Sequence, residues 1–231
     1  MKPRTVAIIQ ARMGSTRLPG KVMMPLGAES ILTYLVGRVS RARTVDSVLV
    51  ATTDLKRDEV IVNECDRHGI LCFRGDEFDV LARYVEAAAV SDADIIVRVT
   101  ADNPFTDPDS IDRVVDAIAI GGADYAIEMN LPIGTTGEAI TRRALVFINE
   151  VALIPRWREH VTLYAKEHPG TLKCTFLEPR PDCNHPDLSF TVDEPGDYEY
   201  VRMLFGNLPD DDFELKKLIA VADEIAVRSF V

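Results

Sequence analysis

Short runs of β-branched and aliphatic residues alternate with amphipathic stretches along the chain, and this alternation is the clearest structural signal in the sequence. The apolar runs predict six strands, several of them hydrophobic enough to be buried on both faces. These strands are Val6–Gln10, Val48–Thr52, Ile95–Thr100, Tyr125–Glu128, Leu172–Leu177 and Leu188–Val192.

The stretches between the strands carry apolar residues at helical spacing, which predicts helices over 31–39 and 80–88. A further helix begins at Asp107-Pro108, because proline suits the first helical position, and Gly121-Gly122 ends it. Strands that alternate with helices in this way indicate a Rossmann-like, three-layer α/β/α fold with a mostly parallel sheet.

The chain has 231 residues, 47% of them hydrophobic, so it can bury one sizeable core, and we expect a single domain over 1–231. The Gly-, Thr- and Pro-rich stretch Asn130–Gly137 breaks the alternation, and Arg142–Lys166 has helical character. We therefore expect an added excursion around residues 130–175. It would serve either as a lid over a site or as a dimer contact, and the sequence leaves both roles open.

The chain is strongly acidic, with a formal net charge of −11. Nucleic acids and anionic membranes are bound by basic faces, so this charge excludes both as general partners. Any phosphate must therefore be bound by a local group of cations. The N-terminal apolar run Val6–Ile9 is too short for a signal-peptide core or a membrane span, from which we expect a cytoplasmic protein.

A local group of cations occurs in Gln10–Lys21, directly after the first predicted strand, with the sequence Q-A-R-M-G-S-T-R-L-P-G-K. Ligands bind beyond the carboxyl ends of the strands in sheets of this kind. The glycines let the backbone approach a ligand, the hydroxyl side chains offer hydrogen bonds, and Arg12, Arg17 and Lys21 supply positive charge. We interpret the segment as a phosphate-binding loop, in preference to a solvated basic loop that binds nothing.

The loop differs from two common phosphate motifs. A P-loop has four residues between its glycines and Ser or Thr after its lysine, whereas Gly14 and Gly20 enclose Ser15–Pro19, and Val22 follows Lys21. A G-x-G-x-x-G fingerprint follows none of the predicted strands. The ATPase and Rossmann dehydrogenase interpretations are therefore disfavoured.

The loop is similar to the signature loop of the cytidylyltransferases that activate 3-deoxy-manno-octulosonate and sialic-acid-like sugars, and it resembles most closely the SpsF-type spore-coat polysaccharide branch. Further segments match this family in the same order along nearly the whole chain. They are Val50–Asp54, Phe73–Glu77, Arg98–Pro104, Arg158–Thr162 and Thr191–Asp197. The resemblance implies a nucleotidyltransferase fold, CTP and an acidic sugar as substrates, and a homodimer.

Asp102 and Asp193 each follow a predicted strand, and carboxylates are ligands that Mg²⁺ prefers. The resemblance implies that aspartates at these two places hold the metal, so we expect both to bind Mg²⁺. The alternative is that each aspartate serves a turn or caps a helix. The resemblance also implies a catalytic set of Arg12, Lys21 and Asp102, in which the two cations neutralise the departing pyrophosphate.

The other expected site residues bind the nucleotide or the acceptor. The nucleotide group is Gln10, Ala11, Arg12, Gly14, Ser15, Lys21, Thr52, Arg74 and Asp76. The acceptor group is Glu138, Glu159 and His160. Simpler interpretations stand beside these, because Arg74 and Asp76 suit an ordinary surface turn and a helical Arg-Glu-His suits a polar face.

The predicted function is a cytidylyltransferase that transfers CMP from CTP to an octulosonate- or nonulosonate-like sugar, with release of pyrophosphate, in surface polysaccharide biosynthesis. The better-known members carry proline where this chain has Gln10, and they differ over residues 74–77. A sugar-phosphate nucleotidyltransferase that uses another NTP is therefore one alternative. A non-catalytic nucleotide-sugar-binding protein is the other.

Overall fold

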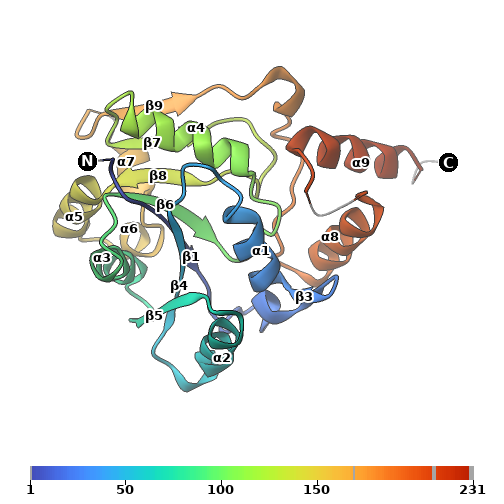
Figure 1. The fold of residues 1–231 in the computed structure, drawn as a ribbon, viewed down its shortest axis with the longest axis horizontal. Coiled ribbons are helices and arrows are strands. Elements are labelled where there is room, and N and C mark those ends of the chain that lie inside the picture. The colour runs from blue at the N-terminus through green and yellow to red at the C-terminus, as the bar shows by residue number, and fades with distance from the viewer. Residues whose placement is uncertain (1, 169, 210–211, 229–231) are drawn as a thin grey trace.

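The computed structural model describes residues 2–168, 170–209 and 212–228, and a seven-stranded sheet lies at its centre (Figure 1). The strand order is β5-β4-β1-β6-β8-β7-β9. These strands are β1 (Thr5–Gln10), β4 (Ser47–Thr53), β5 (Leu71–Gly75), β6 (Ile95–Thr100), β7 (Tyr125–Glu128), β8 (Glu138–Thr141) and β9 (Cys174–Leu177). The first five predicted strands are thus confirmed. A small hairpin of β2 (Pro25–Leu26) and β3 (Glu29–Ser30) precedes the first long helix.

The central strands are parallel, so their carboxyl ends meet at one edge of the sheet. β1 runs parallel to both β4 and β6, and β5 runs parallel to β4. β8 runs antiparallel to its neighbours β6 and β7, so the sheet is mostly parallel, as predicted. Gln10 and Thr100, the last residues of β1 and β6, stand opposite each other in register.

Helices cover both faces of the sheet (Figure 1). The helices on one face are α1 (Ile31–Val39), α2 (Glu59–His68) and α4 (Pro108–Ala119), and those on the other are α3 (Val80–Val90) and α5 (Arg142–Val151). In β1, Ala7 and Ile9 pack with the first group while Ile8 packs with the second, because successive side chains of a strand point to opposite faces. The predicted three-layer α/β/α architecture is confirmed.

Local capping chemistry starts the long helices. Asp79 and Asp107 each accept a hydrogen bond from the backbone N–H three residues later, at the starts of α3 and α4, and Thr141 does the same for α5. Pro108 follows Asp107 in the first turn of α4, where its missing N–H leaves no hydrogen bond unmade. The helix predicted to begin at Asp107-Pro108 is confirmed.

The C-terminal helices α8 (Pro195–Asn207) and α9 (Leu215–Arg228) build a third apolar cluster against α1. Two fully buried rings, Phe105 and Phe190, meet edge to face within this cluster, with their centroids 6.3 Å apart. The cluster therefore anchors the chain just after β6 and the chain just before Asp193 to the same packing unit.

The predicted strand Leu188–Val192 is wrong. In the structure this segment is irregular, with an isolated bridge between Ser189 and Ile133. Its alternating apolar residues, Phe190 and Val192, are buried in the third cluster, so their spacing reflects packing and not sheet pairing.

The region around 130–175 contributes β8 to the middle of the sheet and then three helices before β9. The helical stretch predicted over 142–166 is divided into α5, α6 (Pro155–Glu159) and α7 (Leu163–Glu167). Pro155 starts a new helix, and Val161 adopts a positive φ of 37° between the last two. α6 packs against α3, which brings its C-terminal end to the edge where β1 and β6 end. The role of this region as a lid or a dimer contact stays a prediction.

Within the described ranges, none of the helices is both long enough and apolar enough to span a membrane.

Candidate active site

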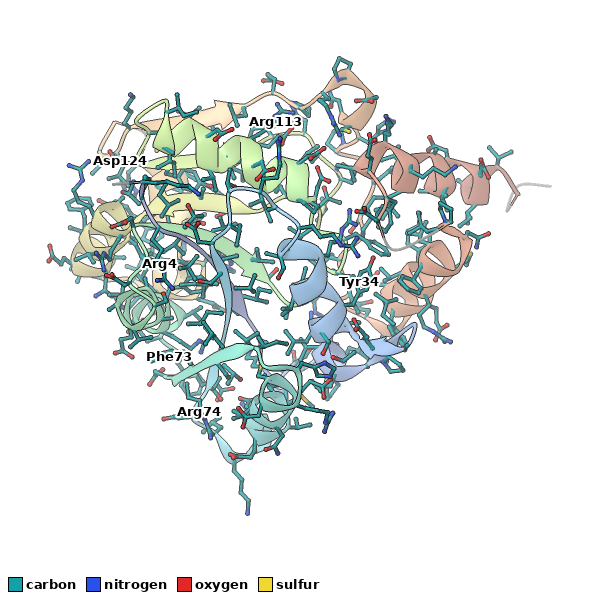
Figure 2. All side chains as sticks on the ribbon, in the orientation of Figure 1. Arg4, Tyr34, Phe73, Arg74, Arg113 and Asp124 are labelled. Carbon is teal, nitrogen blue, oxygen red and sulfur yellow. The ribbon has the colours of Figure 1, made fainter. Side chains whose placement is uncertain are left out.

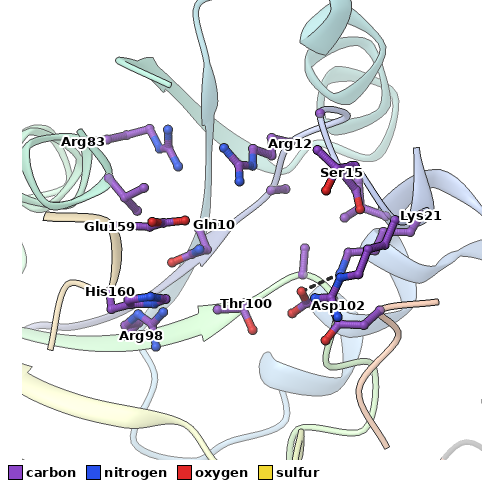
Figure 3. A pocket seen from close by; sticks show the side chains of 18 residues that line it. Gln10, Arg12, Ser15, Lys21, Arg83, Arg98, Thr100, Asp102, Glu159 and His160 are labelled. Carbon is purple, nitrogen blue, oxygen red and sulfur yellow. Dashed lines mark hydrogen bonds and ion pairs between the residues drawn. The ribbon is translucent and has the colours of Figure 1, made fainter. Parts of the chain in front are cut away.

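A pocket of about 390 Å³ opens at the carboxyl ends of β1 and β6 (Figure 3). The loop after β1 forms one end of the pocket, and β6, α3 and α6 contribute to its other walls. The predicted site residues in these walls are Gln10, Ala11, Arg12, Gly14, Ser15, Lys21, Asp102, Glu159, His160 and Asp193.

The loop after β1 is held in shape by hydrogen bonds within the protein. The Met13 carbonyl accepts from the N–H groups of Ser15 and Gly20. Gly20 has a φ of 74°, a left-handed conformation that glycine adopts without strain. The carboxylate of Asp58, which is fully buried, accepts from the Met13 N–H at 2.6 Å and from the Thr53 hydroxyl. The loop is therefore fixed by the protein itself.

Lys21 joins the loop to two aspartates. It begins the short 3₁₀ helix η1 (Lys21–Met23), and its side chain is almost buried. The Lys21 Nζ atom lies 2.8 Å from Asp102 Oδ2 and 2.9 Å from Asp193 Oδ1, and it donates to the Val192 carbonyl at 2.7 Å. Three residues that the sequence predicted from distant positions thus meet at one point.

The position of Asp193 is set by its neighbours in the chain. The Val192 N–H donates to the Asp102 carbonyl at 2.8 Å, which places the two aspartates side by side. The Asp197 carboxylate accepts from the N–H groups of Asp193 and Glu194 at the start of α8. The irregular segment that replaces the predicted strand therefore still delivers Asp193 to the site.

Asp193 is ionised at neutral pH. Burial opposes its ionisation, but hydrogen bonds and charges from Lys21 and Arg17 outweigh burial and hold the pKa of Asp193 below its usual value. The Arg17 guanidinium lies 3.0 Å from its Oδ1 atom.

The two aspartates fit a divalent cation in their chemistry. Asp102 and Asp193 direct carboxylate oxygens to one point, and the Lys21 ammonium already places a positive charge there. Mg²⁺ is commonly bound through one or two carboxylates, with water and substrate phosphate oxygens completing its shell. Among the residues that the structure describes, no group of three or more His, Cys, Asp or Glu side chains is arranged to hold a metal. A metal here would use these two carboxylates and compete with Lys21 for their oxygens.

The other end of the pocket is formed by side chains from α3, β6 and the end of α6. Figure 3 shows Arg83, Glu159, His160 and Arg98 there, with Gln10 between them and Lys21. The pocket therefore has one end formed by the loop after β1 and a second polar end. Two of the three predicted acceptor-binding residues, Glu159 and His160, line the second end.

Comparison with known proteins agrees with this geometry. Residues 6–224 match the family described as cytidylyltransferase. The chain belongs to this family. It is 39% identical over 211 residues to the spore coat polysaccharide biosynthesis protein SpsF of Bacillus subtilis, a match that covers 88% of each chain. It is also 35% identical over 111 residues to a 3-deoxy-manno-octulosonate cytidylyltransferase of Trichlorobacter lovleyi, which covers 48% of this chain and 43% of that protein.

Solved structures place the fold in the same family. A cytidylyltransferase from Leptospira borgpetersenii matches with a TM-score of 0.90 and 29% sequence identity, over 97% of this chain and 96% of that chain. The predicted nucleotidyltransferase fold and the resemblance to the SpsF-type cytidylyltransferases are confirmed.

Three residues of this cytidylyltransferase that were expected to bind the nucleotide lie outside the pocket walls. Thr52 is fully buried in β4. Arg74 belongs to β5 and lies beside α2 (Figure 2), where it donates to the backbone carbonyls of residues 53–55 and pairs with Glu59 at 2.9 Å. Asp76 accepts from the backbone N–H groups of residues 78 and 79, as a turn residue does. Direct contact of Thr52, Arg74 or Asp76 with a nucleotide therefore stays a prediction, and their position outside the pocket walls does not favour it.

Glu138 lies behind the pocket wall and not in it. Its buried carboxylate accepts from Lys166 and the Thr162 hydroxyl and lies 3.7 Å from the Arg98 guanidinium. Burial works against ionisation, but the charges of Arg98 and Lys166 hold the pKa of Glu138 below its usual value. Glu138 is thus connected to the pocket through Arg98.

Arg83, Arg98 and Thr100 line the pocket but were not predicted as site residues. Arg98 and Thr100 belong to a segment that matched the family, and Arg98 is a charge within an otherwise apolar strand. Arg83 lies beside Tyr84 in α3 and is 2% exposed. A charged residue at a position that periodicity assigns to the interior is the signal that identifies such residues.

Proposed function

We propose that this cytidylyltransferase transfers CMP from CTP to an acidic sugar of the octulosonate or nonulosonate type and releases pyrophosphate. The observation that carries the proposal is the meeting of Lys21, Asp102 and Asp193 beside the loop after β1. The names of the relatives, which refer to spore coat polysaccharide and to 3-deoxy-manno-octulosonate, support an acidic sugar acceptor and a role in surface polysaccharide biosynthesis. Cytoplasmic location and a homodimer belong to the same proposal.

The loop after β1 is expected to hold the phosphates of CTP. Backbone N–H groups and the Ser15 hydroxyl can donate to phosphate oxygens, and Arg12 and Lys21 can neutralise the charge that grows on the departing pyrophosphate. The Oε1 atom of Gln10 is buried and has no hydrogen-bond partner among the described residues, so it is available to accept a hydrogen bond from the ligand.

The reaction is an in-line substitution at the α-phosphorus of CTP. A hydroxyl oxygen of the sugar forms a bond to this phosphorus, the bond to the bridging oxygen of the β-phosphate breaks, and the hydroxyl proton passes to solvent. The pocket would align the two substrates for this attack. Asp102 and Asp193 would hold Mg²⁺, which neutralises phosphate charge and lowers the pKa of a coordinated hydroxyl.

The test is an Asp193→Ala variant assayed for both binding and turnover. We expect pyrophosphate release to fall by roughly 100-fold or more, because charge stabilisation at a reacting phosphate supplies several kcal/mol, while CTP binding is weakened far less. Asp187→Ala, at an exposed aspartate that contacts His185, is the matched control and should leave turnover unchanged. A wild-type protein that binds CTP or a CMP-sugar but releases no pyrophosphate would instead support the nucleotide-sugar-binding alternative.

A further inference from the structure

Two arginines line the end of the pocket that lies away from Lys21 (Figure 3). Arg83 comes from the first turn of α3, and Arg98 comes from the middle of β6. The charges of both act on the buried Tyr84, whose hydroxyl donates to the carbonyls of Ile8 and Val99. Neither arginine takes part in the cluster of Lys21 with the two aspartates.

Arg83 is a buried cation that forms no ion pair with any described residue, although the charges of Asp58 and Asp76 act on it from a longer distance. Its guanidinium donates to the Asp76 backbone carbonyl, and its Nε atom has no hydrogen-bond partner among the described residues. Over the same ranges, no carboxylate oxygen lies within 4.0 Å of the Arg83 guanidinium, the limit for an ion pair. Arg83 is only 2% exposed, and the part of it that is accessible faces the pocket. Burial lowers the pKa of Arg83, which shows that the surroundings oppose its charge.

Arg98 is only partly neutralised. Its nearest carboxylate, Glu138, is 3.7 Å away and is shared with Lys166 and Thr162, so two cations depend on one carboxylate. The Arg98 Nε atom, like that of Arg83, is buried and has no partner in the part of the chain that the structure describes.

The remaining groups at this end do not neutralise the arginines. Glu159 contributes the one carboxylate in this wall, and among the described contacts it pairs with neither guanidinium. His160 adds a ring that can donate or accept. A buried charge is costly unless it is paired and hydrogen-bonded. One of these guanidiniums has no ion pair among the described residues and the other shares its carboxylate with Lys166, and both face the cavity, which indicates that an anionic ligand completes their surroundings.

We propose that Arg83 and Arg98 form a second anion subsite, which binds the charged group of the acceptor while the loop after β1 binds the phosphates of CTP. The inference rests on the proposed function and adds the residues that select an anionic acceptor. The planar guanidinium donates two parallel hydrogen bonds to a carboxylate or a phosphate. The anion is therefore either the carboxylate of an acidic sugar or the phosphate of a sugar phosphate, and Glu138 positions Arg98 from behind.

The experiment measures acceptor binding to protein whose phosphate loop is already occupied. The full chain is saturated with Mg²⁺ and a CTP analogue that carries a methylene group between the α- and β-phosphorus. Calorimetric titrations then use 3-deoxy-manno-octulosonate, N-acetylneuraminate, glucose 1-phosphate and inorganic phosphate as probes. They compare the wild type with Arg83→Met and Arg98→Met. Arg143→Met is the matched control, because the Arg143 side chain is 84% exposed and pairs with Asp124 at the surface.

We expect the wild type to bind at least one anionic probe, and both pocket variants to bind it more weakly by about 10-fold or more, because each variant loses hydrogen bonds to the charged group of the probe. The CTP analogue should bind the variants within about twofold of the wild type, and Arg143→Met should change neither affinity. A carboxylate probe that binds identifies an acidic sugar, and a preference for glucose 1-phosphate identifies a sugar phosphate. If a Met variant does not fold, Arg83→Lys and Arg98→Lys retain the charge without the planar fork and should still weaken the probe measurably.

Three results would overturn the subsite. The first is that the wild-type complex binds none of the probes. The second is that the variants bind the probe as tightly as the wild type does, and the third is that their affinity for the CTP analogue falls as much as their affinity for the probe. Pyrophosphate release with CTP itself separates this failure from failure of the proposed function. If the probe binds but no pyrophosphate is released, the proposed transferase function is wrong and the subsite still stands. If pyrophosphate is released and the acceptor KM is unchanged in both variants, the transferase function stands and the subsite is wrong.

Discussion

At the scale of single residues, Lys21 decides the electrostatics of the site. Its ammonium group lies within 3 Å of the carboxylates of Asp102 and Asp193. Without this positive charge the two carboxylates would repel each other. In the proposed function, the substrate and the metal would therefore redistribute the contacts of Lys21 when they bind.

Replacement of Lys21 by methionine tests this arrangement without an activity assay. Lys21→Met keeps the apolar stem but leaves the two carboxylates facing each other, so the pKa of Asp193 should rise and the free energy of unfolding should fall by about 2 kcal/mol. Mg²⁺ should restore more stability to the variant than to the wild type, because it replaces the missing cation. Urea unfolding at pH 7 with and without Mg²⁺ measures both effects. An equal Mg²⁺ response in the two proteins would show that Asp102 and Asp193 do not form a cation site.

Asp58 holds the loop after β1 in place. In Asp58→Ala the Met13 N–H and the Thr53 hydroxyl lose their acceptor, which should lower the free energy of unfolding by about 1–3 kcal/mol. The affinity for CTP should fall about 10-fold, because a loop that is no longer fixed must be ordered by the ligand. Calorimetric titration of CTP measures this, with the exposed Asp66→Ala as control. Unchanged CTP affinity in a folded Asp58→Ala protein would remove Asp58 from this role.

Sequence reasoning found residues at this scale where their type and position coincided. Lys21, Asp102 and Asp193 were recognised because cations and carboxylates followed predicted strands in a family-like order. Arg83 and Arg98 were not predicted, because only the packed structure shows that Arg83 has no ion pair among the described residues and that Arg98 shares Glu138 with Lys166. Arg74 was wrongly favoured as a nucleotide-binding residue for the opposite reason. Its guanidinium already donates to nearby backbone carbonyls, so its hydrogen bonds are made within the protein.

At the scale of elements, the residue that caps the N-terminus of α4, Asp107, has a carboxyl group that titrates at a raised pH. Burial raises the pKa of Asp107 to about 6, although the charge of Arg38 opposes this shift. The pKa of Asp107 in the folded state therefore lies above its ordinary value of 3.8. The folded state holds the proton more tightly, so this residue destabilises the fold progressively as the pH rises from about 4 through about 6.

Asp107→Asn should remove this pH dependence. Asparagine caps helices as well as aspartate does and resembles the protonated form. The variant should gain stability relative to the wild type between pH 4 and pH 7.5, by up to about 3 kcal/mol. Urea unfolding at pH 4.5 and 7.5 measures the difference. A stability difference that does not change between these two pH values would contradict the assigned pKa.

Elements were predictable where the local pattern was long. β1, β4, β6 and α4 combine clear periodicity with capping or turn residues, and their boundaries followed. β8 was not predicted because it is four residues long and starts with Glu138, a charged residue that a strand pattern does not include. The partners that neutralise it, Arg98 and Lys166, lie far away in the sequence. The segment 188–192 failed because buried alternation also arises where a loop packs on a helical cluster.

At the scale of the whole molecule, the parallel strands and the third apolar cluster work together. The sheet places Gln10 and Thr100 side by side at its carboxyl edge, and the cluster around Phe105 and Phe190 brings Asp193 from the C-terminal part of the chain to the same edge. The α/β class follows from alternation alone. The convergence of the two aspartates does not, because it depends on a long-range contact between irregular segments.

The most direct test of the central claim is pyrophosphate release from each of the four NTPs with Mg²⁺, against a panel of octulosonate and nonulosonate sugars. The account predicts release with CTP and an acidic sugar, and its loss in Asp102→Ala while the fold is retained. Release with another NTP and a sugar phosphate, or release that persists in Asp102→Ala, would contradict it.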